Sequence, residues 1–415
     1  MSTAFHWFLP TGGDARDPGP VRPILPGARR RIIPPGSTGE TPKYIQYEGV
    51  PPALPAGRPT PRADPTRSTG QGLCGAAHGT GIGGPSAGAP AGRPATLGYL
   101  TQLAQAADQL GYEAVLTPTG AHCEDAWITT AALIAATRRL KFLVAFRPGL
   151  VEPALAAQTA ATFQRLSGGR LLLNVVAGGS DAEQRGYGDR LDHDARYARA
   201  DEFLDVVRTA WRGAPYDHAG PHYRIDGGQL RQPPEPAPRI YFGGSSDPAL
   251  AVAARHADTY LTWGEPVAQV AEKTARVREL AAAQGRSPRF GLRVHVLSRA
   301  TAARAREDAE ALLAGLDDSA IAAGQRRLRA LESVGQRRML DLHGGRRDRL
   351  WIAPNLWAGL GLVRGGAGTA LVGSHREVAD RLAEYRAAGI DEFVLSGYPH
   401  LEEAYTFAEH VRPLL

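Results

Sequence analysis

Short apolar segments alternate with helical segments along most of the chain, and this alternation restricts the fold more than any other feature. The apolar segments are hydrophobic on both faces, as in 171–176 and 290–296, and a segment with helical periodicity follows each of them. Strands that are buried on both faces and separated by helices are typical of parallel βα units. About eight such units can be counted, which favours an α/β fold of the (β/α)₈ TIM barrel type over an open sheet.

The expected elements follow from this periodicity and from local end signals. Strands are expected at 6–10, 114–116, 141–145, 171–176, 239–242, 259–262, 290–296 and 392–395. Helices are expected from 97 to about Gly111, over 125–137, 153–166, 194–211, 248–256 and 266–283, twice between 302 and 333, over 374–388 and at the C-terminus. Ser374 and Glu377 have the spacing of a capping box, which fixes the start of the last but one of these helices.

The segment from residue 15 to residue 95 interrupts the pattern. Pro, Gly, Arg and Ser dominate it, as in PPGSTGETP and GIGGPSAGAPAGRP, and no period is sustained. A segment of this composition buries too little apolar surface to offset the entropy lost on ordering it. We therefore expect one barrel domain over 1–415, with a largely disordered insertion in its first βα loop.

The composition argues against several classes of protein. The net charge is +6, but the basic residues, nearly all Arg, are spread along the chain, whereas a nucleic-acid-binding protein gathers them on one face. No apolar run is long enough to span a bilayer, and the start MSTAFHWFLPTGGD lacks the features of a signal peptide. The two cysteines, Cys74 and Cys123, give no disulfide framework, and no cluster has metal-ligand spacing. We expect a soluble cytoplasmic protein without a metal.

The stretch 359–373, GLGLVRGGAGTALVG, is rich in glycine and carries a single charge, Arg364. Glycine lets a backbone rearrange at low cost, and Arg pairs bidentately with oxyanions. We interpret 355–373 as a mobile lid that closes over an anion at the active site. A flexible surface loop with an incidental Arg is the alternative.

The segment GGSSDP, residues 243–248, joins an expected strand to an expected helix. Free backbone N–H groups and Ser hydroxyls at a helix start can bind phosphate, and phosphates commonly dock on the late βα loops of barrels. An ordinary capped turn is the alternative. Near the end of the fourth strand, Asn174, Gly178 and Gly179 would let a flat cofactor approach, unless they form only a tight turn.

Ionisable side chains occur on or after three other strands. Arg293 and His295 alternate within a strand, so they point to the same face, where apolar neighbours favour a cavity containing an anion over a solvent-facing edge. Tyr398 and His400 follow the last strand, with a structural turn as the alternative. Cys123 follows the second strand without a visible activating base, and a small packing residue is the alternative there.

Nine segments of the chain together closely resemble the FMNH₂-dependent alkanesulfonate monooxygenases of the bacterial-luciferase-like flavin group. The resemblance covers residues 5–14 and about 96–415. The segments are WFLPTGGD, PTGAHCEDAW, LKFLVAFRPG, YFGGSSD, YLTWGEP, RFGLRVHV, SVGQRRML, PNLWAGLGLVRGGAGTALVG and SGYPHLEEAY.

The resemblance implies a two-component oxidoreductase of sulfur acquisition. A separate NAD(P)H-dependent FMN reductase would supply reduced FMN, and FMNH₂ with O₂ would convert an alkanesulfonate into an aldehyde and sulfite. A homo-oligomer, a tetramer in the family, is also implied. Carried over by position, the sulfonate and proton-transfer group is Arg293, His295, Arg364 and Tyr398, with Cys123 near the flavin. The implied flavin contacts are Gly244 and Ser245 in the phosphate loop, with Asn174, His193 and Tyr197 as further candidates.

The chain departs from the family pattern in three places. Gly12 stands where family members often carry His, the first βα loop is far longer, and the chain ends soon after Tyr405. Two alternatives therefore accompany the main hypothesis. One is a related barrel enzyme that uses another reduced flavin or deazaflavin, or that oxidises methanesulfonate, a sulfone or another organosulfur compound. The other is a catalytically impaired flavin-binding protein.

Overall fold

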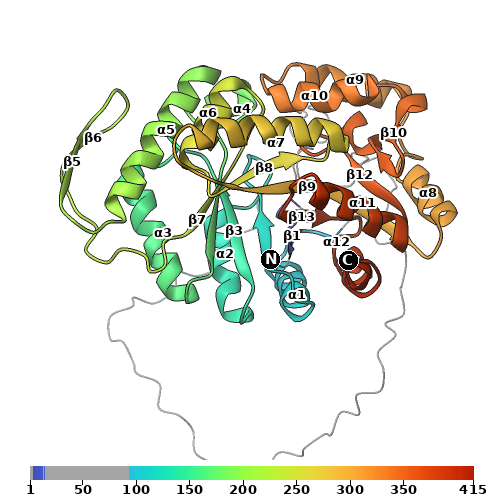
Figure 1. The fold of residues 1–415 in the computed structure, drawn as a ribbon, viewed down its shortest axis with the longest axis horizontal. Coiled ribbons are helices and arrows are strands. Elements are labelled where there is room, and N and C mark those ends of the chain that lie inside the picture. Colours follow the sequence, from blue (N-terminus) through green and yellow to red (C-terminus); the bar gives the residue numbers. More distant parts are fainter. Residues whose placement is uncertain (1–2, 13, 15–92) are drawn as a thin grey trace, which may run out of the picture. The chain divides into compact units, whose positions relative to one another are not determined.

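The computed structural model describes residues 3–12, 14 and 93–415, and its centre is a closed parallel barrel (Figure 1). The strands of the barrel, in spatial order, are β1 (Ala4–Phe8), β2 (Ala114–Thr117), β3 (Lys141–Phe146), β4 (Leu171–Val175), β7 (Arg239–Gly243), β8 (Thr259–Trp263), β9 (Arg289–Arg299) and β13 (Glu392–Ser396). Pairing of β13 with β1 and of β8 with β9 closes the ring. The predicted (β/α)₈ barrel is confirmed, whereas the predicted insertion at 15–95 lies almost wholly outside the described residues.

Helices surround the strands (Figure 1). They are α1 (Leu97–Gln109), α2 (Ala126–Leu133), α3 (Pro153–Ser167), α4 (Asp181–Gly186), α5 (His193–Ala210), α6 (Asp247–His256), α7 (Val267–Ala282), α8 (Ala302–Ala311), α9 (Asp318–Arg329), α10 (Val334–His343), α11 (His375–Ala387) and α12 (His400–Thr406). The predicted capping box is present at the start of α11. None of the described helices combines the length and apolar character needed to cross a bilayer.

Two predicted elements have different ends. The first strand ends at Phe8 instead of residue 10, because Pro10 has no N–H to donate to a ladder. The helix predicted over 125–137 ends at Leu133, where a 3₁₀ turn over Ile134–Ala136 tightens the chain before β3. The other predicted strands and helices are confirmed to within a few residues at each end.

The sequence did not predict several elements on the rim of the barrel. They are α4, α10, the hairpin of β5 (Tyr216–Ala219) and β6 (Arg224–Gly228), and the strands β10 (Trp351–Ala353), β11 (Leu356–Trp357) and β12 (Ala370–Ser374). The outer part of β9, beyond its pairing with β8, pairs with β12 instead. This pairing carries the glycine-rich stretch onto the C-terminal end of the barrel.

Side chains fill the barrel, so it is a core and not a pore. Its middle is apolar, with Phe8, Leu116, Leu143, Leu172, Tyr241, Leu261 and Val394 in one buried cluster. At the N-terminal end, the buried Glu392 accepts hydrogen bonds from Tyr241 at 2.6 Å and Arg239 at 3.0 Å. The C-terminal end, called the mouth below, is where Arg293 and His295 face inward.

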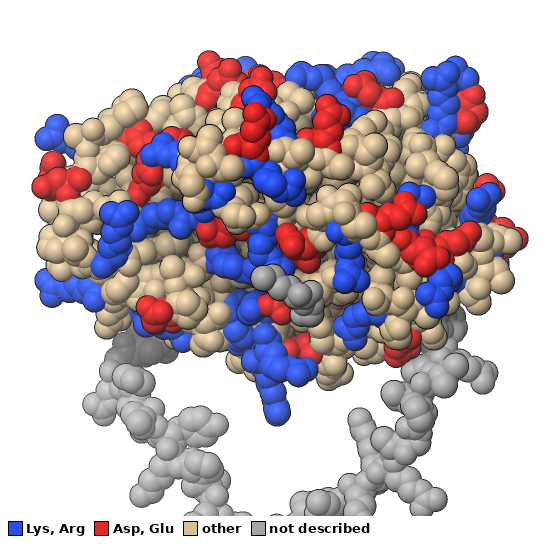
Figure 2. Space-filling model, viewed as in Figure 1, with Lys and Arg blue, Asp and Glu red and all other residues tan. Residues whose placement is uncertain are grey.

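Charges of both signs are interspersed over the face of the molecule seen in Figure 2. The net charge of +6 is therefore not gathered into a basic patch on this face.

Candidate active site

Two arginines enter the mouth from different parts of the chain. Arg293 projects inward from β9, and its guanidinium carbon lies 4.7 Å from the ring centroid of Phe8. Arg364 comes from the Arg364 loop, defined here as residues 363–369, and lies over the ring of Tyr398 at 5.2 Å. Arg293 is 6% exposed and Arg364 is 4% exposed, so both cations are buried.

Within the described residues, neither guanidinium forms an ion pair with a carboxylate. Arg293 donates only to the backbone oxygens of Val294 and Val394, at 3.1 and 3.5 Å, and Nη1 of Arg364 is buried without a hydrogen-bond partner. Burial, together with the charge of Arg364, lowers the pKa of Arg293 to about 9. Burial likewise lowers the pKa of Arg364 to about 10, against a smaller opposing effect of Cys123 and Asp14. An anion bound between them would relieve this cost.

His295 is a neutral residue that uses both of its ring nitrogens. Its Nε2 lies 3.1 Å from the Ala367 carbonyl, which can only accept, so Nε2 carries the hydrogen and Nδ1 accepts from the Ser396 hydroxyl at 2.7 Å. Burial and the nearby charge of Arg293 hold the pKa of His295 well below its usual range. The ring stacks on Tyr398, with centroids 5.4 Å apart.

Tyr398 keeps a free hydroxyl in this group. The residue is buried between the His295 ring and the Arg364 guanidinium, and its Oη has no hydrogen-bond partner in the described residues. The four predicted head-group residues, Arg293, His295, Arg364 and Tyr398, therefore come together at the mouth. Tyr398 thus combines a hydroxyl proton that can be transferred with an unused polar atom.

Asp14 and His400 also belong to this region, although the prediction assigned them no role. The His400 ring is fully buried and packs against Phe8 and Tyr398, with centroids 5.6 and 5.2 Å away. Asp14 accepts the His400 backbone N–H at 2.9 Å and the Tyr99 hydroxyl. Asp14 could have been proposed from the sequence, because it is an acidic residue in the loop that follows the first strand.

Cys123 lies at the rim of the mouth and is partly buried. Burial raises the pKa of its thiol to about 11, and the neighbouring Thr11 side chain offsets only part of the effect. The side chain is therefore a thiol at neutral pH, as expected for a cysteine without an activating base. Arg147, which the prediction missed, lies nearby and bonds to Glu183 at 2.9 Å and Gln184 at 2.8 Å.

The loop after β7 forms a backbone cradle. Gly244 has φ +147°, and a Cβ there would meet the Cβ of Ala249 at 2.5 Å and the Tyr197 hydroxyl at 3.2 Å. Ser246 is the N-cap of α6 but does not cap the helix with its side chain. The first N–H groups of α6, next to this cradle, are therefore not satisfied by the N-cap side chain.

The other predicted cofactor residues lie around this cradle or below it. His193 begins α5, and its ring lies 4.9 Å from that of Tyr197. Ser245 faces the first turn of α10, because a Cβ on Gly335 would lie 3.6 Å from its Oγ. Asn174 lies within the barrel wall, on β4 opposite Tyr241 of β7. Gly244, Ser245, His193 and Tyr197 thus lie close together, and Asn174 lies toward the barrel interior.

Two helices hold the predicted lid against the barrel. The stretch 359–373 is only partly a loop, because Gly359–Leu362 is a 3₁₀ turn and β12 begins at Ala370. Gln325 of α9 donates to the Leu362 carbonyl at 2.7 Å, and Gln336 of α10 accepts the Gly366 N–H at 2.9 Å. Movement of the lid, which stays a prediction, would therefore require these contacts to α9 and α10 to break or both helices to move with it.

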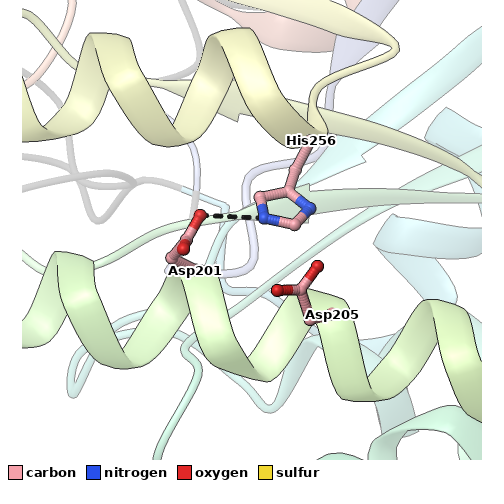
Figure 3. Close-up of side chains that lie close together, drawn as sticks. All are labelled: Asp201, Asp205 and His256. Carbon is pink, nitrogen blue, oxygen red and sulfur yellow. Dashed lines mark hydrogen bonds and ion pairs between the residues drawn. The ribbon is translucent and has the colours of Figure 1, made fainter. Parts of the chain in front are cut away.

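One group of possible metal ligands lies away from the mouth. Asp201 and Asp205 of α5 face His256 at the end of α6 (Figure 3). His256 lies 2.9 Å from an Asp201 oxygen, and Arg255 forms ion pairs with both carboxylates. Since a guanidinium already neutralises both acids, we interpret the group as a structural link between α5 and α6.

Comparisons with known proteins match most of the chain. A family model described as luciferase-like monooxygenase matches residues 74–392. A riboflavin lyase, RcaE, with modified FMN and riboflavin as substrate, is similar with TM-score 0.67 and 24% identity over 77% of this chain and 84% of that chain. EDTA monooxygenase from Chelativorans sp. BNC1 gives TM-score 0.64 and 22% identity over 77% of this chain and 86% of that chain. Long-chain alkane monooxygenase LadA gives TM-score 0.65 and 21% identity over 76% of this chain and 83% of that chain. At these identities the structural matches support the fold.

Proposed function

The chain belongs to the luciferase-like monooxygenase family, and we propose that it is an FMNH₂- and O₂-dependent alkanesulfonate monooxygenase that releases an aldehyde and sulfite. The observation that carries the proposal is the pair of buried guanidiniums, Arg293 and Arg364, without a carboxylate paired to either in the described residues. A sulfonate is a permanent monoanion, so it stays complementary to Arg across the working pH range.

The backbone cradle around Gly244 suits the phosphate of reduced FMN. Three features would hold the phosphate: the space at Gly244 that a Cβ would fill, the first turn of α6 without a side-chain cap, and the Tyr197 hydroxyl. Ser245 and His193, which lie next to this cradle, would contribute further contacts, and Asn174 on β4 is another candidate. When bound, the reduced flavin would supply the electrons that activate O₂.

The residues at the mouth would then divide the work on the substrate. Arg293 and Arg364 hold the sulfonate oxygens and thereby orient the carbon–sulfur bond. Tyr398 supplies a hydroxyl for proton transfer, and the neutral ring of His295 keeps that phenol in place by stacking. Cys123 lines the rim as a thiol. The Arg364 loop, backed by α9 and α10, excludes water.

We also propose that the chain works with two kinds of protein partner. A separate NAD(P)H-dependent reductase would deliver the reduced FMN. A second copy of the chain would cover the outer faces of α2 and α3, which are uncharged apart from Arg165 and expose Ile128 (74%), Leu155 (53%) and Leu166 (71%). Such apolar faces favour self-association. Analytical ultracentrifugation of the wild type and of Ile128→Glu checks this, and equal monomeric mass for both would contradict it.

Sulfite release tests the main proposal. The protein is mixed with FMNH₂, O₂ and octanesulfonate, and sulfite is compared with a control that lacks the sulfonate. Sulfite above the control supports the proposal. Sulfite only from methanesulfonate, or oxidation only of a sulfone, indicates a related enzyme instead. Binding of FMNH₂ in a fluorescence titration without any turnover indicates an impaired flavin-binding protein, as the Gly12 departure would allow.

A further inference from the structure

Gln336 joins the Arg364 loop to α10, the helix whose first turn faces Ser245. It lies in the first turn of α10, directly after Gly335, whose Cβ position is 3.3 Å from the Trp263 ring. Its side-chain Oε1 accepts the backbone N–H of Gly366 at 2.9 Å. The residue is 2% exposed, and its Nε2 is buried with no hydrogen-bond partner in the described residues.

An unused buried amide is uncommon, because nearly all buried polar groups in folded proteins have a hydrogen-bond partner. Here the unused Nε2 belongs to the side chain whose Oε1 accepts the N–H of Gly366, two residues after Arg364. Within the part of the chain that the structure describes, Nη1 of Arg364 and Oη of Tyr398 are likewise buried without a hydrogen-bond partner, and the Arg364 guanidinium lies over the Tyr398 ring. Three polar atoms around one loop therefore lack the same kind of partner, an acceptor of hydrogen bonds.

We infer that Gln336 is a further head-group ligand, whose Nε2 donates to a substrate oxygen while its Oε1 anchors the loop. The inference rests on the proposed function and deepens it. A tetrahedral sulfonate offers three equivalent oxygens, so it can accept from Arg293, Arg364 and Gln336 together. A planar carboxylate offers only two oxygens. Three donors that converge from different directions match three oxygens arranged as a tripod better than two oxygens in one plane, so a third donor favours sulfonates over carboxylates of the same chain length.

Two variants separate the donor from the anchor. Gln336→Glu keeps an oxygen for the Gly366 N–H but loses the donor and adds a negative charge. Gln336→Met loses both the donor and the anchor but adds no charge. Only the loss of the donor is common to the two variants. The wild type and both variants are loaded with reduced FMN under anaerobic conditions and titrated calorimetrically with octanesulfonate and with nonanoate.

The inference predicts that both variants bind octanesulfonate at least tenfold more weakly, while the affinity for nonanoate changes less, so that the preference for sulfonate falls. Gln336→Glu is also expected to keep a melting temperature near that of the wild type, since a carboxylate oxygen still accepts the Gly366 N–H. Weakening in Gln336→Met alone would mean that Gln336 is only an anchor. Weakening in Gln336→Glu alone would reflect charge, and either result overturns the inference. If the wild type itself does not bind octanesulfonate, the proposed function fails with it.

Discussion

Arg364 lies over the ring of Tyr398 at 5.2 Å, although the two residues belong to loops on opposite sides of β12, α11 and β13 in the sequence. The same phenol ring stacks on His295, which shares its strand face with Arg293. A pair of stacked rings thus connects the two guanidiniums of the mouth, Arg293 and Arg364. A negatively charged group that enters the mouth would meet both cations next to the only unused hydroxyl of the four predicted head-group residues.

Arg293→Ala is expected to lower sulfite release at least about a hundredfold, because the variant loses a desolvated charge that acts on the substrate anion. Steady-state sulfite assays check this. Arg289→Ala is the matched control, since Arg289 lies on the same strand face at the other end of the barrel and pairs with Glu392 at 3.0 Å. Per folded molecule, the control should keep wild-type turnover. Equal loss in both variants would show that the effect is structural.

Tyr398→Phe is expected to lower kcat roughly a hundredfold while leaving KM for octanesulfonate nearly unchanged. The phenyl ring keeps the stacking on His295 and the contact with Arg364, so only the free hydroxyl is lost. Initial rates over a range of octanesulfonate concentrations separate the two constants. An unchanged kcat would remove Tyr398 from proton transfer.

Gly244→Ala is expected to weaken binding of reduced FMN by at least about tenfold, because φ is +147° there and the new Cβ would collide with Ala249. Anaerobic fluorescence titration measures the dissociation constant. Gly186→Ala serves as the control, since a Cβ there meets nothing within 4 Å. If both variants bind reduced FMN like the wild type, the cradle is not the phosphate site.

The affinity for sulfonate is expected to fall as the pH rises above about 9. Burial holds the pKa of Arg293 at about 9 and that of Arg364 at about 10, and the protonated forms are the ones that bind an anion. Below this range both groups are charged, so KM should be flat from neutral pH upward and then rise. The sulfonate itself does not titrate in this range. A bound anion raises both pKa values, so kcat should fall at a higher pH than kcat/KM. A KM that does not change up to pH 10.5 would contradict this reading.

Excision of residues 18–90 is expected to leave the melting temperature within about 2 °C of the wild type, as predicted for an insertion without a folded core of its own. The ends of the excised segment can be joined by a short linker, because the Asp14 N–H donates to the Arg93 carbonyl at 2.9 Å. Calorimetric melting of both proteins checks this. A large drop in melting temperature would mean that the insertion contributes to the fold.

Local patterns were enough to predict the strands and the inward face shared by Arg293 and His295, since alternation along a strand depends on near neighbours alone. The barrel then brings the strand ends together, which is why the residues predicted from separate loops meet at one mouth. The contact between Asp14 and His400 could not be predicted, because it joins the first and last βα loops. The role of Gln336 could not be predicted either, because α10 was not predicted. The hydrogen bond from the Gly366 N–H to Gln336 depends on how α10 packs against the barrel.

Arg293 and Arg364 are proposed to hold one substrate anion between them. A crystal structure of the protein with octanesulfonate and FMN tests this arrangement most directly. Sulfonate oxygens are expected within about 3.2 Å of both guanidinium groups. A sulfonate bound elsewhere, or one that reaches neither arginine, would contradict it.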